Sequence, residues 1–139
     1  MKVRELMTAP VLTIEPGEPV DVAARTLTQY NIGALPVCTR EGRLCGLITD
    51  RDLVTRCMAS QKPPTTPVRD VMSTGVAWVS PETEVDLAAH LMGRRQIRRL
   101  PVVENGKLQG MLTLADLARR EESIQDAADA LGDISENMR

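Results

Sequence analysis

Two short stretches of the chain place a threonine and an aspartate at the same spacing. Thr49 and Asp52 stand in GLITDRDL, and Thr113 and Asp116 stand in GMLTLADL. A hydroxyl can donate to a phosphate, and a carboxylate can accept hydrogen bonds from both hydroxyls of a ribose. The T-x-x-D spacing is equally that of a capping box, in which the two side chains only satisfy a helix N-terminus. The spacing alone leaves both functions open.

Both threonines are expected where a strand turns into a helix, because an apolar run that starts at Gly46 or Gly110 precedes each of them. A helix N-terminus carries unsatisfied N–H groups and about half a positive charge, and both favour a phosphate. A turn of this kind brings a hydroxyl, a carboxylate and free N–H donors to one place. This combination is chemically suited to a sugar phosphate.

The densest basic stretch of the chain is RRQIRR, residues 94–99. Arg94 and Arg95 are expected near a helix C-terminus, where cations offset the helix dipole, which leaves Arg98 and Arg99 as candidates for binding a phosphate. The chain as a whole has 17 Lys and Arg against 19 Asp and Glu, a formal net charge of -2. Such a balance provides no global field for nucleic acid or an anionic membrane, so we expect neither as a partner.

The sequence lacks the residue patterns of common catalytic and metal centres. Three cysteines and one histidine show no metal-motif spacing, and no Ser-His-Asp, Cys-His or phosphate-loop pattern occurs. We therefore expect no catalytic residue, no bound metal and no enzyme activity. The N-terminus has no apolar signal segment and no run reaches the roughly 18–20 residues of a membrane span, which predicts a cytoplasmic protein.

The chain repeats itself. Residues 3–27 match residues 68–92 at an offset of 65, since 68 − 3 = 65, and residues 32–38 match residues 97–103 at the same offset. A segment that is written twice in the same order indicates one structural unit used twice.

Each copy contains a predicted hairpin, and the second hairpin is one residue shorter. Asn105-Gly106 is a strong signal for a two-residue turn. In the first copy, residues 40–42 must then form a three-residue loop whose last residue, a glycine, adopts a positive φ. This alignment of the two strands places Cys45 opposite Val37.

Each copy is expected to run strand, helix, strand, strand, helix. The opening strands are residues 11–14 and 76–79, and the helix after each carries an apolar stripe at i, i+3, i+4 and i+7. The stripes are Val20, Ala23, Ala24 and Leu27 in the first copy, and Val85, Ala88, Ala89 and Met92 in the second. The second copy should close with a helix over about residues 115–131. Its spacing places Leu117, Ile124, Ala128 and Leu131 on one side, with Gly132 as its stop.

The repeats define the predicted domain boundaries. Residues 1–58 form the first repeat, residues 59–67 are a linker with three prolines, and residues 68–120 form the second repeat. Residues 121–139 form a C-terminal helical extension. Its surplus length can pack against a partner subunit or cap its own domain, and the sequence leaves both open.

The doubled pattern M-[TS]…P…G-h-h-T-x-x-D-h, with ALPV and RLPV before the two hairpins, resembles a pair of CBS domains, also called a Bateman module. The resemblance covers residues 3 to about 120. It implies an α/β (α+β) fold in which two βαββα repeats pack through their sheets with pseudo-two-fold symmetry. It also implies two clefts that can hold adenine nucleotides or related adenosyl ligands.

Carried over by position, the resemblance assigns residues to both clefts. In one cleft, Thr113 and Arg99 would bind phosphate and Asp116 would bind ribose. Its base pocket would be lined by Leu12, Ile32, Gly33 and Ala34. The other cleft would use Thr49, Arg51 and Asp52 against Ala77, Ile97 and Arg98.

The two clefts are not expected to bind equally well. Gly33-Ala34 of the first copy becomes Arg98-Arg99 in the second, so Arg99 adds cationic charge beside Thr113. Beside Thr49, Asp50 would repel a phosphate unless Arg51 offsets it.

The expected function is a regulatory sensor that binds AMP, ADP, ATP or another adenosyl compound and signals to an unidentified effector protein. No cofactor is required. A ligand-free CBS-pair scaffold or protein-interaction dimer is the alternative, and a homodimer is expected in either case. The sequence does not decide between a parallel and an antiparallel dimer.

Overall fold

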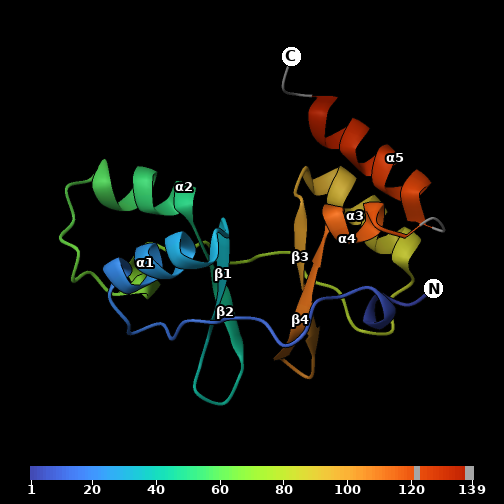
Figure 1. The fold of residues 1–139 in the computed structure, drawn as a ribbon. Helices are drawn as coiled ribbons and strands as arrows, with labels where there is room; N and C mark the ends of the chain where they lie inside the picture. The colour runs from blue at the N-terminus through green and yellow to red at the C-terminus, as the bar shows by residue number, and fades with distance from the viewer. Residues whose placement is uncertain (121–122, 137–139) are drawn as a thin grey trace. The chain divides into compact units, whose positions relative to one another are not determined.

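The computed structural model describes residues 1–120 and 123–136, and the chain divides into two compact units. We call Leu12–Val76 the central unit, and we call Met1–Val11 together with Ala77–Arg139 the terminal unit. Each unit contains one two-stranded antiparallel sheet covered by helices (Figure 1). None of the described helices has the length and apolar character needed to cross a membrane.

The central unit is built around the hairpin of β1 (Ala34–Cys38) and β2 (Leu44–Thr49). Its main helix, α1 (Val20–Tyr30), precedes the hairpin. A short α2 (Asp50–Asp52) follows β2 and continues as the π-helix η2 (Leu53–Met58). The last element is the 3-10 helix η3 (Val68–Asp70).

The terminal unit repeats this plan and adds one helix. It begins with the 3-10 helix η1 (Val3–Glu5) and resumes with α3 (Val85–Arg95). The hairpin of β3 (Arg99–Glu104) and β4 (Lys107–Thr113) leads into α4 (Leu114–Ala118). The added helix is α5 (Ile124–Ser135), which contacts both α3 and α4 (Figure 1).

The compact units do not coincide with the sequence repeats, because the opening segments of the two copies are exchanged. The first 11 residues belong to the terminal unit, where Thr8 forms an antiparallel bridge with Met111 of β4. The corresponding Ser73 of the second copy bridges Leu47 of β2 in the central unit. Each unit therefore joins most of one repeat to the first segment of the other, and the predicted domain boundaries describe the sequence repeat only.

The hairpin turns form as the sequence predicts. Asn105 and Gly106 have φ angles of 53° and 78°, the combination that a two-residue type I′ turn requires. The three-residue loop of the first copy ends at Gly42, whose φ is 87°.

The predicted pairing of Cys45 with Val37 is wrong by one residue. Gly46 pairs with Val37, and the register shifts between Val37 and the next residue, so Cys45 is the extra residue of a β-bulge. The second hairpin has its bulge at the same place, with Val102 opposite Gly110. The bulge places the glycine of each G-h-h-T motif opposite a core valine, a register that the loop length alone does not reveal.

The opening strand predicted for each copy is reduced to a single parallel bridge. The bridging pairs are Ile14 with Val37 and Val79 with Val102. The residue before each bridged valine is a proline, Pro36 or Pro101, which has no N–H to donate to a neighbouring strand. The predictions of regular strands at 11–14 and 76–79 are therefore wrong, although both segments do lie beside their hairpins.

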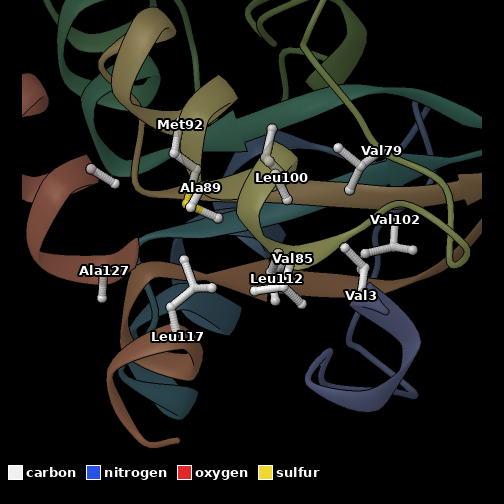
Figure 2. Packing of buried hydrophobic residues seen from close by; sticks show 12 residues of the cluster. Val3, Val79, Val85, Ala89, Met92, Leu100, Val102, Leu112, Leu117 and Ala127 are labelled. Atoms are coloured by element: carbon white, nitrogen blue, oxygen red, sulfur yellow. The ribbon is translucent and has the colours of Figure 1, made fainter. Parts of the chain in front are cut away.

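Each unit has its own apolar core, built from the predicted helix stripe and the inner faces of the hairpin. In the terminal unit the core residues come from β3, β4 and the elements packed beside them, as Figure 2 shows. They include Val3, Val85, Ala89, Met92, Leu100, Leu112 and Leu117. The central core includes Ile14, Val20, Ala23, Leu27, Leu35, Val37 and Ile48. In each unit, burial of the helix stripe against the hairpin provides the apolar contact that holds helix and hairpin together.

The two stripes differ at one position. Ala89 of α3 is buried, whereas the equivalent Ala24 of α1 is exposed. The reason is α5, whose buried Ala127 and Ala130 face α3 and cover this side of it. The C-terminal extension is thus part of the terminal unit's packing.

The single closing helix predicted over residues 115–131 is wrong. The described residues form α4 up to Ala118 and α5 from Ile124, while residues 121–122 and 137–139 lie outside the described part of the chain. Gly132 does not stop α5, which continues to Ser135. The apolar spacing across the break imitates one helix, because each half is itself amphipathic.

Candidate functional site

The T-x-x-D motif of the second copy forms a complete capping box at the start of α4. The backbone N–H of Asp116 donates to Thr113 Oγ1 at 3.1 Å, and the backbone N–H of Thr113 donates to Asp116 Oδ2 at 2.9 Å. The other carboxylate oxygen accepts from the Arg119 guanidinium at 2.7 Å. Asp116 is only 5% exposed, so these hydrogen bonds replace the water that would otherwise solvate its carboxylate.

The motif of the first copy forms the same box at the start of α2. Asp52 N–H donates to Thr49 Oγ1 at 3.0 Å, and Thr49 N–H donates to Asp52 Oδ2 at 3.1 Å. The Ser73 hydroxyl lies 3.1 Å from both oxygens of the carboxylate. The structure therefore confirms the capping interpretation in both copies. It leaves ribose binding a prediction, since each carboxylate oxygen has more than one acceptor position.

The residues before each hairpin lie beside the capping box of the same unit. Arg99 pairs with Thr113 across β3 and β4, and the N–H of Leu114 donates to Arg98 O at 2.9 Å. We call Arg98, Arg99 and Thr113–Asp116 the Thr113 corner.

The first copy has an equivalent arrangement. Ala34 pairs with Thr49, and the N–H of Asp50 donates to Gly33 O at 3.1 Å. We call Gly33, Ala34 and Thr49–Asp52 the Thr49 corner. Each corner therefore carries the residues on which the copies differ most, two arginines in one and a glycine and an alanine in the other.

A cavity of about 580 Å³ opens at the Thr113 corner. Its lining residues come from the corner, α4 and α5, and they are Arg98, Arg99, Thr113, Leu114, Ala115, Ala118, Ile124, Ala127, Ala128 and Leu131. The lining contains two cations and no carboxylate. No salt bridge joins either guanidinium to any carboxylate among residues 1–120 and 123–136. The cavity therefore combines apolar walls with uncompensated positive charge, which suits an anion that has an apolar part.

The two corners also differ at the second residue of the helix. In the Thr49 corner, the N–H of Arg51 donates to Asp50 Oδ1 at 2.8 Å. The second copy has Leu114 in place of Asp50, and the equivalent N–H, that of Ala115, has no hydrogen-bond partner in the described part of the chain. In the Thr49 corner this backbone N–H donates to a carboxylate of the protein, whereas in the Thr113 corner the equivalent N–H is available to a ligand.

The remaining predicted site residues are distributed over both units. Leu12 and Ile32 lie in the central unit and are 42% and 37% exposed. Ala77 and Ile97 pack against the core of the terminal unit. The assignment of these residues to particular clefts stays a prediction. Arg98, predicted for the cleft of Thr49, lines the cavity at the Thr113 corner.

Sequence analysis missed the part of α5 that lines the cavity. Ile124, Ala128 and Leu131 were placed on one helix face by their spacing, but nothing in that spacing shows that the face borders the Thr113 corner. The described residues include no group of three or more His, Cys, Asp or Glu arranged to hold a metal ion.

Similarity to known proteins identifies the repeated unit. A model of the CBS domain family matches residues 3–59 and 68–123. CBS domain-containing protein YhcV of Bacillus subtilis is 40% identical over 133 residues, which cover 96% of this chain and 94% of YhcV.

Two similar solved structures are described as complexes with adenosyl ligands. A structure described as CBSX2 in complex with AMP is 28% identical, has a TM-score of 0.77, and is matched over 89% of this chain and 98% of its own. The CBS domain pair of protein MJ0100, in complex with 5′-methylthioadenosine and S-adenosyl-L-methionine, is 26% identical with a TM-score of 0.75. That match covers 86% of this chain and 94% of the other.

Proposed function

Since the chain belongs to the CBS domain family, we propose that it is a regulatory module that binds an adenosyl ligand at the Thr113 corner and signals occupancy to a partner protein. A regulatory role fits the extent of the family match, because the two CBS domains at residues 3–59 and 68–123 account for most of the chain. The fold and the presence of AMP or S-adenosyl-L-methionine in similar structures support this class of ligand.

The observation that carries the proposal is the cavity lined by Arg98, Arg99 and Thr113. A phosphate there would accept from the two guanidinium groups and from the Thr113 hydroxyl, whose oxygen already accepts from Asp116 N–H and whose proton remains available to donate. Apolar walls beside these donors suit the face of a purine. Asp116 is 5% exposed and does not line the cavity, so a ribose contact with its carboxylate would require a rearrangement of the Arg119 side chain that covers it.

The same chemistry disfavours the Thr49 corner for a phosphate. Asp50 holds the Arg51 N–H with its own carboxylate, so a phosphate would have to displace one negative charge and face its repulsion. We therefore propose unequal affinities, with the Thr113 corner the tighter. Leu12, Ile32, Gly33 and Ala34 remain the proposed base-contacting residues.

The test is a binding titration on protein from which co-purified nucleotide has been removed. AMP, ADP, ATP and S-adenosylmethionine are titrated by calorimetry against the wild type and Arg99→Gln. Hydrogen bonds to charged groups contribute about 1.5–3 kcal/mol each, so loss of the Arg99 guanidinium should weaken the phosphate ligands by roughly 10- to 100-fold.

A matched variant separates site charge from overall charge. Arg94→Gln removes the same charge from an exposed residue of α3 that does not line the cavity, and it should bind like the wild type. Equal losses in both variants would mean that the net charge, not the corner, governs binding. No binding of any of the four ligands would contradict the proposed function.

A ligand-free dimeric scaffold is the second candidate, and a surface feature of the central unit favours it. Val54 and Met58 of η2 are 57% and 75% exposed, and exposed apolar side chains of this size are suited to a protein interface. We propose a homodimer in either case. Light scattering on Met58→Ser and the wild type tests whether this surface holds the dimer: equal dimerisation in both would exclude it.

A further inference from the structure

The cavity at the Thr113 corner has one wall that lies outside both T-x-x-D motifs. This wall is the face of α5 that carries Ile124, Ala128 and Leu131. Ile124 is 50% exposed and Leu131 is 44% exposed, although α5 buries Ala127, Ala130 and Ile134 in the same unit. One side of α5 is therefore packed, and the adjacent side is apolar, accessible and turned to the cavity.

We propose that α5 is a ligand-contacting wall of the Thr113 site, so that docking of α5 on α3 and binding of an adenosyl anion stabilise each other. The inference rests on the proposed function and adds a regulatory element to it. The occupant is indicated by charge complementarity: Arg98 and Arg99 provide two cations, no carboxylate lines the cavity, and the residues that α5 contributes to the lining are aliphatic. A ligand with an anionic end and an apolar ring system matches both.

Coupling follows because the wall is held in place by the packing of α5 on α3 and α4. A ligand that touches Ile124 or Leu131 binds the docked state better than the undocked state, and it shifts the population toward docking. By thermodynamic reciprocity, any change that loosens α5 must weaken the ligand by the same factor. An occupied site would thus present α5 to a partner protein in one fixed position.

The contact between α3 and α5 offers a way to loosen the wall without touching the cavity. A Cβ added to Gly93 of α3 would lie 2.7 Å from Asp133 Oδ2 and 3.0 Å from Asp133 Cβ. Both distances are shorter than ordinary van der Waals contact, so Gly93→Ala must rotate the Asp133 carboxylate and displace α5 by a few tenths of an ångström. Neither Gly93 nor Asp133 lines the cavity.

Gly132 provides a matched control on α5 itself. A Cβ at this position meets nothing within 4 Å, so Gly132→Ala makes the same chemical change without a clash. Both substitutions raise helix propensity, by about 1 kcal/mol each. A difference in ligand affinity between the two variants therefore reports the docking of α5.

The experiment measures AMP affinity by calorimetry and hydrogen exchange of α5 with and without AMP. Gly93→Ala should raise the Kd for AMP at least about fivefold relative to the wild type and Gly132→Ala, a typical size for coupling between sites. Asp133→Ala in the Gly93→Ala background removes the 2.7 Å contact and should restore part of the affinity. In the wild type, AMP should slow amide exchange over residues 124–135.

A second pair of variants covers the case in which Gly93→Ala fails to fold. Ile124→Ser removes an exposed apolar side chain from the wall, and Leu87→Ser removes one of similar exposure, 61%, from α3 outside the cavity. Only Ile124→Ser should weaken AMP, by about tenfold if most of the side chain becomes buried under the ligand.

The outcomes separate this inference from the proposed function. Wild-type binding of AMP that is unchanged in Gly93→Ala and Ile124→Ser would overturn the role of α5 and leave the sensor intact. If Ile124→Ser instead dissociated a dimer without affecting AMP, the apolar face would belong to a second copy, and the inference would be wrong. No AMP binding by the wild type would overturn the proposed function and the inference with it.

Discussion

Replacement of Asp116 tests how much stability the capping box of α4 provides. Asp116→Ala removes the acceptor of the Thr113 N–H and the partner of Arg119, bonds of 2.9 Å and 2.7 Å. Loss of an N-terminal cap typically costs about 1 kcal/mol. The Thr113 N–H is part-buried, so leaving it without a partner costs no more than the roughly 1–3 kcal/mol of a fully buried N–H. An ion pair with an exposed arginine contributes about 0.2–1 kcal/mol. Because these contributions overlap, we expect a loss of roughly 2 kcal/mol in the free energy of unfolding.

Asp116→Asn separates the two partners. The amide oxygen can still accept from the Thr113 N–H, but the charge that attracts Arg119 is lost, so we expect a cost of only about 0.5 kcal/mol. Urea denaturation of both variants, with the exposed Asp70→Asn as control, measures the difference. Equal losses in Asp116→Ala and Asp116→Asn would refute the argument, because the charge and not the N–H acceptor would then be the stabilising feature.

Three further predictions concern other parts of the chain. Gly110→Ala should lower the thermal midpoint by more than about 5 °C, because its Cβ would lie 2.6 Å from the Thr8 carbonyl oxygen, a backbone atom; differential scanning calorimetry measures it. Burial raises the pKa of the Cys38 thiol to about 11, so iodoacetamide at pH 8 should label the half-buried Cys45 much faster than Cys38. Mass spectrometry measures the two labelling rates, and equal rates would contradict the burial of Cys38. The hydrogen bond from Lys2 lowers the pKa of the Glu84 carboxyl, so the stability that this carboxylate contributes is present above its ordinary pKa and is lost as the pH falls through the lowered value. Glu84→Gln should therefore reduce the change in the free energy of unfolding that is measured between pH 5 and pH 3. An unchanged pH dependence would show that the ion pair contributes nothing.

The local features of the fold could be predicted because the same sequence pattern occurs in both copies of the repeat. The two turns, the capping boxes and the core-facing stripes each depend on residues close in sequence, and two copies with one offset constrain them jointly. The exchange of opening segments could not be predicted, since the repeat is the same whether residues 3–8 lie beside their own hairpin or the other one. Only the long-range bridges of Thr8 and Ser73 distinguish the two arrangements.

The candidate site was predictable to a smaller extent. Arg99 and Thr113 could be placed together because a hairpin pairs them. The effect of Asp50 could be stated only as repulsion, because its bond to the Arg51 N–H depends on a side-chain rotamer. The cavity wall formed by α5 could not be predicted, because the apolar spacing continues from α4 into α5 and therefore predicts a single helix. A regular spacing does not show where a helix ends and the chain changes direction.

The exchange of opening segments gives the chain a nested order, in which one continuous unit is inserted into another. Leu12–Val76 is complete once its own last residue has left the ribosome, whereas Met1–Val11 must wait for Ala77 and the residues after it. Met1–Val11 is therefore synthesised before Leu12–Val76 but can pack into its own unit only after that unit has been completed. It follows that a cut at residues 59–67 would not release two independent domains, because each fragment would lack a segment that the other one carries. Separating the two units would instead require cutting on both sides of Leu12–Val76 and joining Val11 to Ala77 through a linker.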